Sequence, residues 1–269
     1  MSTRSCGVVG SPVAHSLSPV MHRAAYAALG LDWTYDATDV PGGTLATFVE
    51  RRGEWRGLSV TAPLKREAAE LADATDEVVR ATGVANTLVR EPDGHVQAFN
   101  TDVPGAVAAL QERGVGAPRL VRILGGGATA VSVAHAVRQM GAERLELVVR
   151  DPDRAQEARE AGERAGLVVA VRLIDDAQAD EVADLLVWTI PGGASEEQAG
   201  ELVGAARAVF DVAYDPWPSP VVAMAQRVGR PAATGLDLLA HQAVLQVELM
   251  TGRTVPVDLL RDTALDHLA

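Results

Sequence analysis

The chain of 269 residues contains a single lysine, Lys65, although it uses arginine at every other strongly basic position. An ammonium loses its proton more readily than a guanidinium when its surroundings change, so a lysine can serve in acid/base chemistry. The only two asparagines, Asn86 and Asn100, follow in the same part of the chain, and each directly precedes a threonine. Asp102 completes the block Asn100-Thr101-Asp102. This grouping favours a role in proton transfer for Lys65 over that of a neutral surface residue.

A second group of residues with chemical meaning begins at the apolar run Leu120–Leu124, which predicts a strand. The turn Gly125-Gly126-Gly127-Ala128-Thr129-Ala130 follows, and Gly141 ends the helix expected after it. This is the Gly-x-Gly-x-x-Ala form of the dinucleotide fingerprint. Its first glycine permits the turn, its second lets the backbone approach a pyrophosphate, and its small last residue lets helix and strand pack closely. The pattern predicts a mononucleotide or dinucleotide site.

The residues after the next predicted strand, Leu145–Val149, should select the nucleotide. An acidic side chain there would accept hydrogen bonds from the ribose of NAD, but the chain continues Arg150-Asp151-Pro152-Asp153-Arg154. Two guanidiniums could hold the 2′-phosphate of NADP through charge-assisted hydrogen bonds. Asp151 opposes this interpretation unless it faces solvent or pairs with an arginine. The segment favours NADP over NAD.

Composition excludes several classes of function. The net charge of -12 argues against binding to nucleic acid or to an anionic membrane surface. The single cysteine, Cys6, lies in an apolar run and is expected to be buried, and the six histidines show no metal-ligand spacing, so no metal is expected. Residues 1–20 lack the pattern of an export signal, and no apolar run approaches the ~18 residues of a membrane span. These features indicate a cytoplasmic protein.

The elements that must position these residues alternate between strand and helix. Strands are predicted at Cys6–Val9, Trp33–Thr38 and Gly57–Val60, and helices at Val20–Leu29 and Gly43–Arg52, with Ser18 as the N-cap and Pro19 as the first helical residue of the former. This alternation is typical of an α/β fold with a parallel or mixed sheet, in which ligands bind at strand ends. Thr61 and Lys65 lie where such a strand ends and the next helix begins.

Later segments complete two α/β domains. Strands are predicted at Thr87–Arg90 and His95–Phe99 around a Pro92-Asp93-Gly94 turn, and at Leu167–Leu173, Leu185–Thr189 and Val209–Val212. Helices are predicted from Asp102, over Pro220–Arg227, over Leu236–Met250 and after Pro256. We expect one domain at 1–102 plus 236–269 and a second, nucleotide-binding domain at 103–235.

Several motifs in the same order resemble the shikimate dehydrogenase family along nearly the whole chain. They are GSPVAHSLSP at 10–19, SVTAPLK at 59–65, GVANT at 83–87 and NTD at 100–102. The resemblance implies a substrate domain with a mixed sheet, a Rossmann-type NADP domain and an active site in the cleft between them. It implies reversible NADPH-dependent reduction of 3-dehydroshikimate to shikimate, toward aromatic amino acids, by a monomer or homodimer.

The resemblance also implies roles for individual residues. Lys65 and Asp102 match the catalytic pair, and we expect Asp102 to keep Lys65 charged, as the acid that protonates the ketone oxygen. Positions that hold the substrate are matched by Ser16, Ser18, Thr61, Lys65, Asn86, Asp102, Tyr214 and Gln242. The hydroxyls of Ser16, Ser18 and Tyr214 suit the ring carboxylate. Cofactor contacts are matched by Glu77, Gly125, Gly126, Gly127, Ala128, Thr129, Arg150, Arg154, Ala213 and Gly235.

The chain departs from the family pattern at several positions. These are Arg23 and Ser59 in place of asparagines, Ala128 in place of a glycine, Val149 and Asp151 in place of asparagine and threonine, and Leu238 in place of a methionine. Alternatives to the main hypothesis are a paralogue that prefers NAD and acts on quinate or an amino-shikimate, and a catalytically silent sensor. A further alternative is the folate dehydrogenase that shares this two-domain plan. Its resemblance would imply a Tyr-x-x-x-Lys pattern at the lysine, but Thr61 stands at the position of that tyrosine here.

Overall fold

A computed structural model describes residues 4–174, 181–190 and 195–268. The chain forms two compact units, which we call unit 1 (Met1–Asp102 with Leu239–Ala269) and unit 2 (Val103–Leu238). The sequence predicted that the chain returns to the first domain between 235 and 236, whereas the observed boundary lies between Leu238 and Leu239. Because Gly235–Thr251 is one continuous helix, no break in the chain marks the residue at which its packing partners change.

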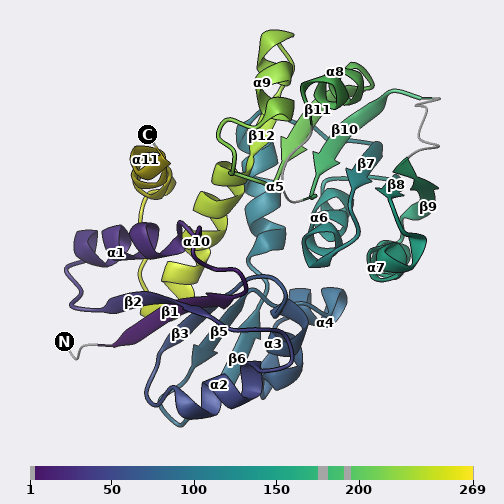
Figure 1. The fold of residues 1–269 in the computed structure, drawn as a ribbon. Coiled ribbons are helices and arrows are strands. Elements are labelled where there is room, and N and C mark those ends of the chain that lie inside the picture. Colours follow the sequence, from purple (N-terminus) through teal and green to yellow (C-terminus); the bar gives the residue numbers. More distant parts are fainter. Residues whose placement is uncertain (1–3, 175–180, 191–194, 269) are drawn as a thin grey trace. The chain divides into compact units, whose positions relative to one another are not determined.

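Unit 1 contains a six-stranded mixed sheet in the order β2-β1-β3-β5-β6-β4 (Figure 1). Its strands are β1 (Ser5–Gly10), β2 (Thr34–Asp39), β3 (Gly57–Val60), β4 (Ala74–Thr75), β5 (Thr87–Arg90) and β6 (Val96–Phe99). Strand β1 runs parallel to β2 and β3, whereas β5 is antiparallel to β3 and β6. The mixed sheet and the two short strands predicted around the Pro92-Asp93-Gly94 turn are confirmed, and the structure pairs these strands antiparallel.

Helices cover both faces of this sheet. They are α1 (Ser18–Ala28), α2 (Leu45–Arg51), α3 (Lys65–Leu71), α4 (Glu77–Thr82), α11 (Val257–Leu268), and residues 239–251 of α10 (Gly235–Thr251). Leu58 and Val60 of β3 belong to the apolar core that also contains Leu45 of α2 and Leu64. Ser59 lies between them and so faces the opposite side of the sheet, where α1 and α10 pack. The sheet therefore has an apolar face and a face that carries buried polar groups.

The start of α1 differs from the prediction. The helix begins at Ser18 itself, its N-cap is Leu17, and no side chain caps it, so the assignment of Ser18 as N-cap was wrong. Pro19 lies within the first turn as expected. The serine at 16 explains the difference, because its Oγ accepts a hydrogen bond from the backbone N–H of Ser18 at 3.3 Å and the chain turns one residue earlier.

Unit 2 contains a six-stranded parallel sheet in the order β12-β11-β10-β7-β8-β9. Its strands are β7 (Leu120–Leu124), β8 (Arg144–Val149), β9 (Val168–Leu173), β10 (Ala183–Trp188), β11 (Ala206–Asp211) and β12 (Ala232–Thr234). Numbered from β7, this is the doubly wound order 3-2-1-4-5-6, in which ligands bind beyond the carboxyl ends of the strands at the point where the order reverses. The Rossmann-type sheet is confirmed.

The helices of unit 2 are α5 (Asp102–Glu112, from its second residue), α6 (Ala128–Gln139), α7 (Gln156–Arg164), α8 (Glu196–Gly204) and α9 (Pro220–Arg227), with a short 3-10 helix, η1 (Pro152–Ala155). Helices α6 and α7 pack together, and α8 and α9 do likewise (Figure 1). Across the described ranges, none of the helices combines the length and apolar composition that a bilayer span requires.

Among the described elements, β4, α4, η1, α8 and β12 were not predicted from the sequence. Strands β4 and β12 have two and three residues, which is too short for an alternating pattern to register. Helix α8 carries a readable signal, because Ser195 and Gln198 form a capping box at its start. Strand β11 begins at Ala206, earlier than the predicted Val209.

The buried face of α1 carries His22, whose ring is stacked on Tyr35 with centroids 4.2 Å apart. Its Nε2 lies 3.2 Å from Oε1 of Gln246. Burial lowers the pKa of His22 to about 4, because the charged imidazolium would be desolvated in the folded state. The imidazole is therefore neutral in the folded protein near pH 7.

His22 should make unit 1 less stable in acid. Its folded pKa lies below the ordinary value, so the unfolded chain binds the proton first and stability falls as the pH drops from about 6.5 to about 4. From pH 7 to pH 4 the loss should be about 3 kcal/mol. Urea unfolding at several pH values should show a flatter pH dependence for His22→Asn. An unchanged pH dependence of stability in folded His22→Asn protein would contradict the assignment.

Candidate active site

A buried ion pair joins the single lysine to an aspartate in unit 1. Nζ of Lys65 lies 2.6 Å from Oδ2 of Asp102, and the residues are only 9% and 7% exposed. Strand β3 ends at Val60 and Lys65 opens α3, so the predicted position at a strand end and a helix start is confirmed. A cation is disfavoured by the dipole at a helix N-terminus, and the carboxylate of Asp102 offsets this.

The second carboxylate oxygen of Asp102 is held by Asn86. Nδ2 of Asn86 donates to Oδ1 of Asp102 at 2.8 Å and to Oγ1 of Thr101 at 2.9 Å. Oδ1 of Asn86 accepts from the backbone N–H of Thr101 at 2.8 Å. Because that N–H can only donate, it fixes the orientation of the Asn86 amide. Each oxygen of Asp102 therefore has a defined partner, Lys65 on one side and Asn86 on the other.

Gln242 and Asn100 complete this cluster. Oε1 of Gln242, on α10, lies 3.2 Å from Nδ2 of Asn86. Oδ1 of Asn100 accepts from the backbone N–H of Asp102 at 3.1 Å, so the aspartate is anchored at its backbone as well. Of the predicted site residues, the structure brings together Lys65, Asn86, Asp102 and Gln242. All four are buried polar groups.

Thr61 follows the last residue of β3, Ser16 lies in the loop between β1 and α1, and Ser18 is the first residue of α1. Ser16 and Ser18 contact one another through the hydrogen bond at the start of α1, although Ser18 is buried within the helix and not on the loop. Thr61 packs on Gly10, where an added Cβ would meet Cγ2 of Thr61 at 2.3 Å. These side chains lie at the carboxyl ends of parallel strands, the edge at which α/β sheets bind ligands.

In unit 2 the glycine-rich turn joins β7 to α6. Gly125 has φ of 113°, a conformation that favours glycine, and Gly127 is the N-cap of α6. Ala130 is fully buried in the helix, as expected for the small residue of the fingerprint. Helix α6 starts at Ala128, so Ala128, Thr129 and Ala130 are helical and the predicted turn ends sooner than expected. The first backbone N–H groups of a twelve-residue helix thus follow directly on the glycines.

The three glycines differ in what surrounds them. A Cβ on Gly126 would lie 2.6 Å from the carbonyl oxygen of Arg154 and 2.8 Å from Cα of Ala155, so η1 crowds this position. A Cβ on Gly127 would meet no atom within 4 Å. Open space at an exposed glycine on a helix N-terminus is the environment in which a dinucleotide phosphate binds. The turn therefore fits a dinucleotide cofactor.

Gly126 and Gly127 offer a matched pair of substitutions. Gly126→Ala should destabilise the protein by about 1–3 kcal/mol because the methyl group would overlap backbone atoms of η1. Gly127→Ala should change stability by less than about 1 kcal/mol, since only its N-cap preference is affected. Both substitutions restrict the unfolded chain equally, so thermal unfolding of the two variants isolates the contact. Equal midpoints would contradict the crowding at Gly126.

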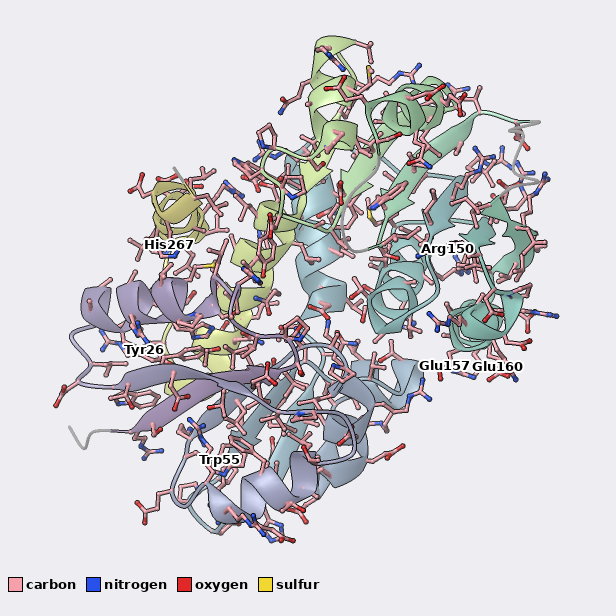
Figure 2. The ribbon with its side chains drawn as sticks, in the orientation of Figure 1. Tyr26, Trp55, Arg150, Glu157, Glu160 and His267 are labelled. Carbon is pink, nitrogen blue, oxygen red and sulfur yellow. The ribbon has the colours of Figure 1, made fainter. Side chains whose placement is uncertain are left out.

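The segment after β8 carries the two arginines. Arg150 follows the last residue of β8 and is exposed, and Figure 2 shows it near the end of that strand, with Glu157 and Glu160 on α7. Asp151 caps η1, because its Oδ1 accepts from the backbone N–H of Asp153 at 3.1 Å. Its other oxygen lies 3.8 Å from Nε of Arg154. The carboxylate that opposed NADP thus caps a helix and faces an arginine.

The remaining predicted residues lie in both units. Glu77 is the first residue of α4 in unit 1 and is exposed. In unit 2, Ala213 and Tyr214 follow β11, and Gly235 opens α10. A Cβ on Gly235 would meet the carbonyl oxygens of Val212 and Ala213 at 2.5 and 2.6 Å, so only glycine allows this approach. Ala213 and Gly235 are thereby brought together.

Comparison with known proteins gives the family. A model of the shikimate dehydrogenase substrate binding domain matches residues 8–88, and one of the shikimate 5′-dehydrogenase C-terminal domain matches residues 235–265. A shikimate dehydrogenase (NADP(+)) of Methanopyrus kandleri is 36% identical, over 99% of this chain and 96% of its own. The chain belongs to the shikimate dehydrogenase family.

Solved structures of family members share the fold. Shikimate 5-dehydrogenase from Thermus thermophilus, in complex with NADP(H) and shikimate, is 31% identical with a TM-score of 0.84, over 98% of this chain and 99% of that one. Quinate dehydrogenase from Corynebacterium glutamicum, in complex with NAD, is 27% identical with a TM-score of 0.86, over 98% of this chain and all of that one.

Two departures from the family pattern have structural explanations. The guanidinium of Arg23 donates from Nε and Nη2 to the carbonyl oxygen of Tyr35, at 2.9 and 2.7 Å, and so ties α1 to β2. Ser59 accepts a hydrogen bond from the hydroxyl of Tyr35 at 2.5 Å and donates to Oε1 of Gln246 at 2.7 Å. Leu238 is buried, and Val149 is the buried end of β8.

The side chains of Thr101 and Gln246 belong to the cluster but were not predicted from the sequence. Thr101 follows directly after Asn100. Its hydroxyl accepts a hydrogen bond from Nδ2 of Asn86 and donates one to Oδ1 of the same amide. Gln246 lies four residues after Gln242, one turn along α10, which places both glutamines on the same face of the helix. That spacing was a signal that could have identified Gln246.

Proposed function

We propose that this shikimate dehydrogenase family member catalyses the reversible reduction of 3-dehydroshikimate by NADPH and a proton, giving shikimate and NADP⁺. The observation that carries the proposal is the buried ion pair between Lys65, the only lysine of the chain, and Asp102. A charged amine in a site screened from water can donate a proton to a developing alkoxide.

In this proposal the cluster of unit 1 binds the hydroxyl groups of the ring. Asn86, Asp102 and Gln242 offer amide and carboxylate groups that can donate to hydroxyls and accept from them. Ser16, Ser18 and Tyr214 bind the ring carboxylate through their hydroxyls, and Thr61 contributes a further hydroxyl. The fixed orientation of the Asn86 amide supports this assignment, because a preorganised side chain loses little freedom on binding.

Lys65 acts as the proton donor in reduction and as the acceptor in oxidation. Its Nζ carries the proton that is transferred, and the hydrogen bond to Asp102 holds the amine in position. When bound, NADPH supplies the hydride. The carbonyl oxygen becomes an alkoxide, and the proton of Lys65 converts it to the hydroxyl of shikimate.

The cofactor would be held by unit 2. The glycine-rich turn from Gly125 to Thr129 would bind the pyrophosphate, and Arg150 and Arg154 would bind the 2′-phosphate of NADP. Glu77, Ala213 and Gly235 are the other proposed contacts. The open space at Gly127 and the capping role of Asp151 support this assignment. We further propose a cytoplasmic location and a monomeric or homodimeric state.

Initial rates with purified protein test the proposal. Shikimate with NADP should produce the absorbance of reduced nicotinamide, and absence of this signal would refute the enzymatic function. Parallel reactions with quinate, and with NAD, separate the alternatives. A clear preference for quinate or for NAD would assign the chain to the paralogue that the quinate dehydrogenase likeness favours.

A further inference from the structure

We propose that Gln246 is a positioning residue, which holds Asn86, and through it Asp102 and Lys65, in the geometry that the reaction needs. The inference rests on the proposed function of Lys65 and Asp102. Gln246 is 1% exposed and lies on α10, on the polar face of the sheet. It does not contact either member of the ion pair in the hydrogen bonds described above.

Gln246 contacts Asn86 and Thr87, the first residue of β5. Its Nε2 donates to the carbonyl oxygen of Asn86 at 3.1 Å and to Oγ1 of Thr87 at 2.9 Å. The hydroxyl of Thr87 in turn donates to Oδ1 of Asn86 at 2.9 Å. One amide group therefore holds both the backbone and, through Thr87, the side chain of Asn86.

The orientation of the Gln246 amide is determined by its neighbours. A carbonyl oxygen can only accept, so the NH₂ group must face Asn86, and a reversed amide would place two carbonyl oxygens together. Oε1 then accepts from the hydroxyl of Ser59 at 2.7 Å. The neutral ring of His22 fits this arrangement, because its Nε2 is 3.2 Å from Oε1 and its Nδ1 has no hydrogen-bond partner.

These hydrogen bonds form one continuous chain of side chains, in which each side chain donates to the next. The hydroxyl of Tyr35 donates to Ser59, Ser59 to Gln246, Gln246 to Thr87, and Thr87 to Asn86. The amide of Asn86 then donates to Oδ1 of Asp102, whose other oxygen binds Lys65. All seven of these side chains are buried, so each lost bond leaves a polar group without access to water.

A purely structural role for Gln246 makes a different prediction. Met250 lies one turn further along α10 and packs on β3, the strand that carries Ser59. A Cβ on Gly57 of this strand would meet Cγ of Met250 at 2.4 Å. Met250 holds α10 to β3 but contacts none of the groups in the chain from Tyr35 to Lys65 in the hydrogen bonds described. Met250→Ala therefore loosens the packing of α10 on β3 and removes none of the hydrogen bonds of that chain.

The single lysine provides a readout that does not depend on activity. Protein labelled with ¹³C-lysine gives one Cε–H cross-peak in an NMR spectrum, and it belongs to Lys65. The spectrum of the Asp102→Asn variant gives the reference position of the cross-peak for a protein that lacks the ion pair. Gln246→Leu should move the cross-peak toward that position and lower kcat about tenfold, because a small displacement of a catalytic group slows the reaction.

Met250→Ala should lower the thermal midpoint and leave the cross-peak in place. If folded Gln246→Leu protein keeps the wild-type cross-peak and kcat while Asp102→Asn moves the peak, the inference is wrong. If wild type has no shikimate activity but Gln246→Leu still moves the peak, the positioning stands and the proposed function fails. Should Gln246→Leu not fold, Ser59→Ala decides, with a smaller shift expected in the same direction and no shift overturning the inference.

Discussion

Lys65→Met should lower kcat for shikimate oxidation by ~10²-fold or more while KM changes little, because the substitution removes the proton acceptor and keeps the bulk of the side chain. The buried position of Lys65 supports a large effect. Its amine is 2.6 Å from Asp102 and is screened from water, so no solvent molecule readily replaces it. Steady-state rates at several pH values, with circular dichroism as a check of folding, measure the effect.

Lys65→Arg separates proton transfer from electrostatics. Arginine keeps the positive charge and can still pair with Asp102, but its guanidinium does not release a proton near neutral pH. If Lys65 is the proton donor, Lys65→Arg should be about as slow as Lys65→Met. A variant with arginine at 65 that retained most of the wild-type kcat would show that charge alone is sufficient, and the proton-transfer role would be abandoned.

Arg150→Ala combined with Arg154→Ala should raise KM for NADPH about tenfold or more and leave KM for NADH nearly unchanged. Each charge-assisted hydrogen bond to a phosphate contributes about 1.5–3 kcal/mol, and only NADPH carries the 2′-phosphate. The side chain of Arg154 is 86% exposed and its contact with Asp151 is long at 3.8 Å, so it is free to bind a ligand. Initial rates with both cofactors measure the selectivity.

The neighbouring helix α7 offers the control. Arg159→Ala combined with Arg164→Ala removes the same charge from the same region, but these arginines pair with Glu163 and Glu160 along the helix. That variant should keep the wild-type preference for NADPH. Equal loss of NADPH affinity in the two double variants would indicate a general effect of charge and not a phosphate site at Arg150 and Arg154.

Much of the fold could be predicted because its strands and helices have strong local signals. The bounds of β3, β7 and α9 agree with the predicted ranges, since each is a compact apolar run with glycine, proline or polar residues at its ends. Signals failed where they were short or ambiguous. Strands β4 and β12 have too few residues to show an alternating pattern. Ser18 was predicted to be an N-cap because the residue types do not reveal the hydrogen bond that Ser16 accepts from the backbone of Ser18.

The candidate site shows the same division. The rarity of Lys65, Asn86 and Asn100, together with the glycine-rich turn, indicated which residues carry chemistry, because lysine, amides and glycine each offer properties that other residues lack. Asp151 could not be interpreted from sequence, since whether it opposes a phosphate depends on the partner its carboxylate finds. In the fold that partner is the start of η1.

The chemical groups, their family and the alternation of strands and helices could be predicted from the amino-acid sequence, since these depend on residue type and short-range order. Which groups meet could not be predicted, because it depends on how the elements pack. Asn86 and Gln242 are 156 residues apart, and Gln246 reaches Ser59 across 187, because α10 packs on the polar face of the sheet. Hydrogen bonds act over about 3 Å, so contacts between distant residues arise only when the packing of α10 on β3 brings them within that reach.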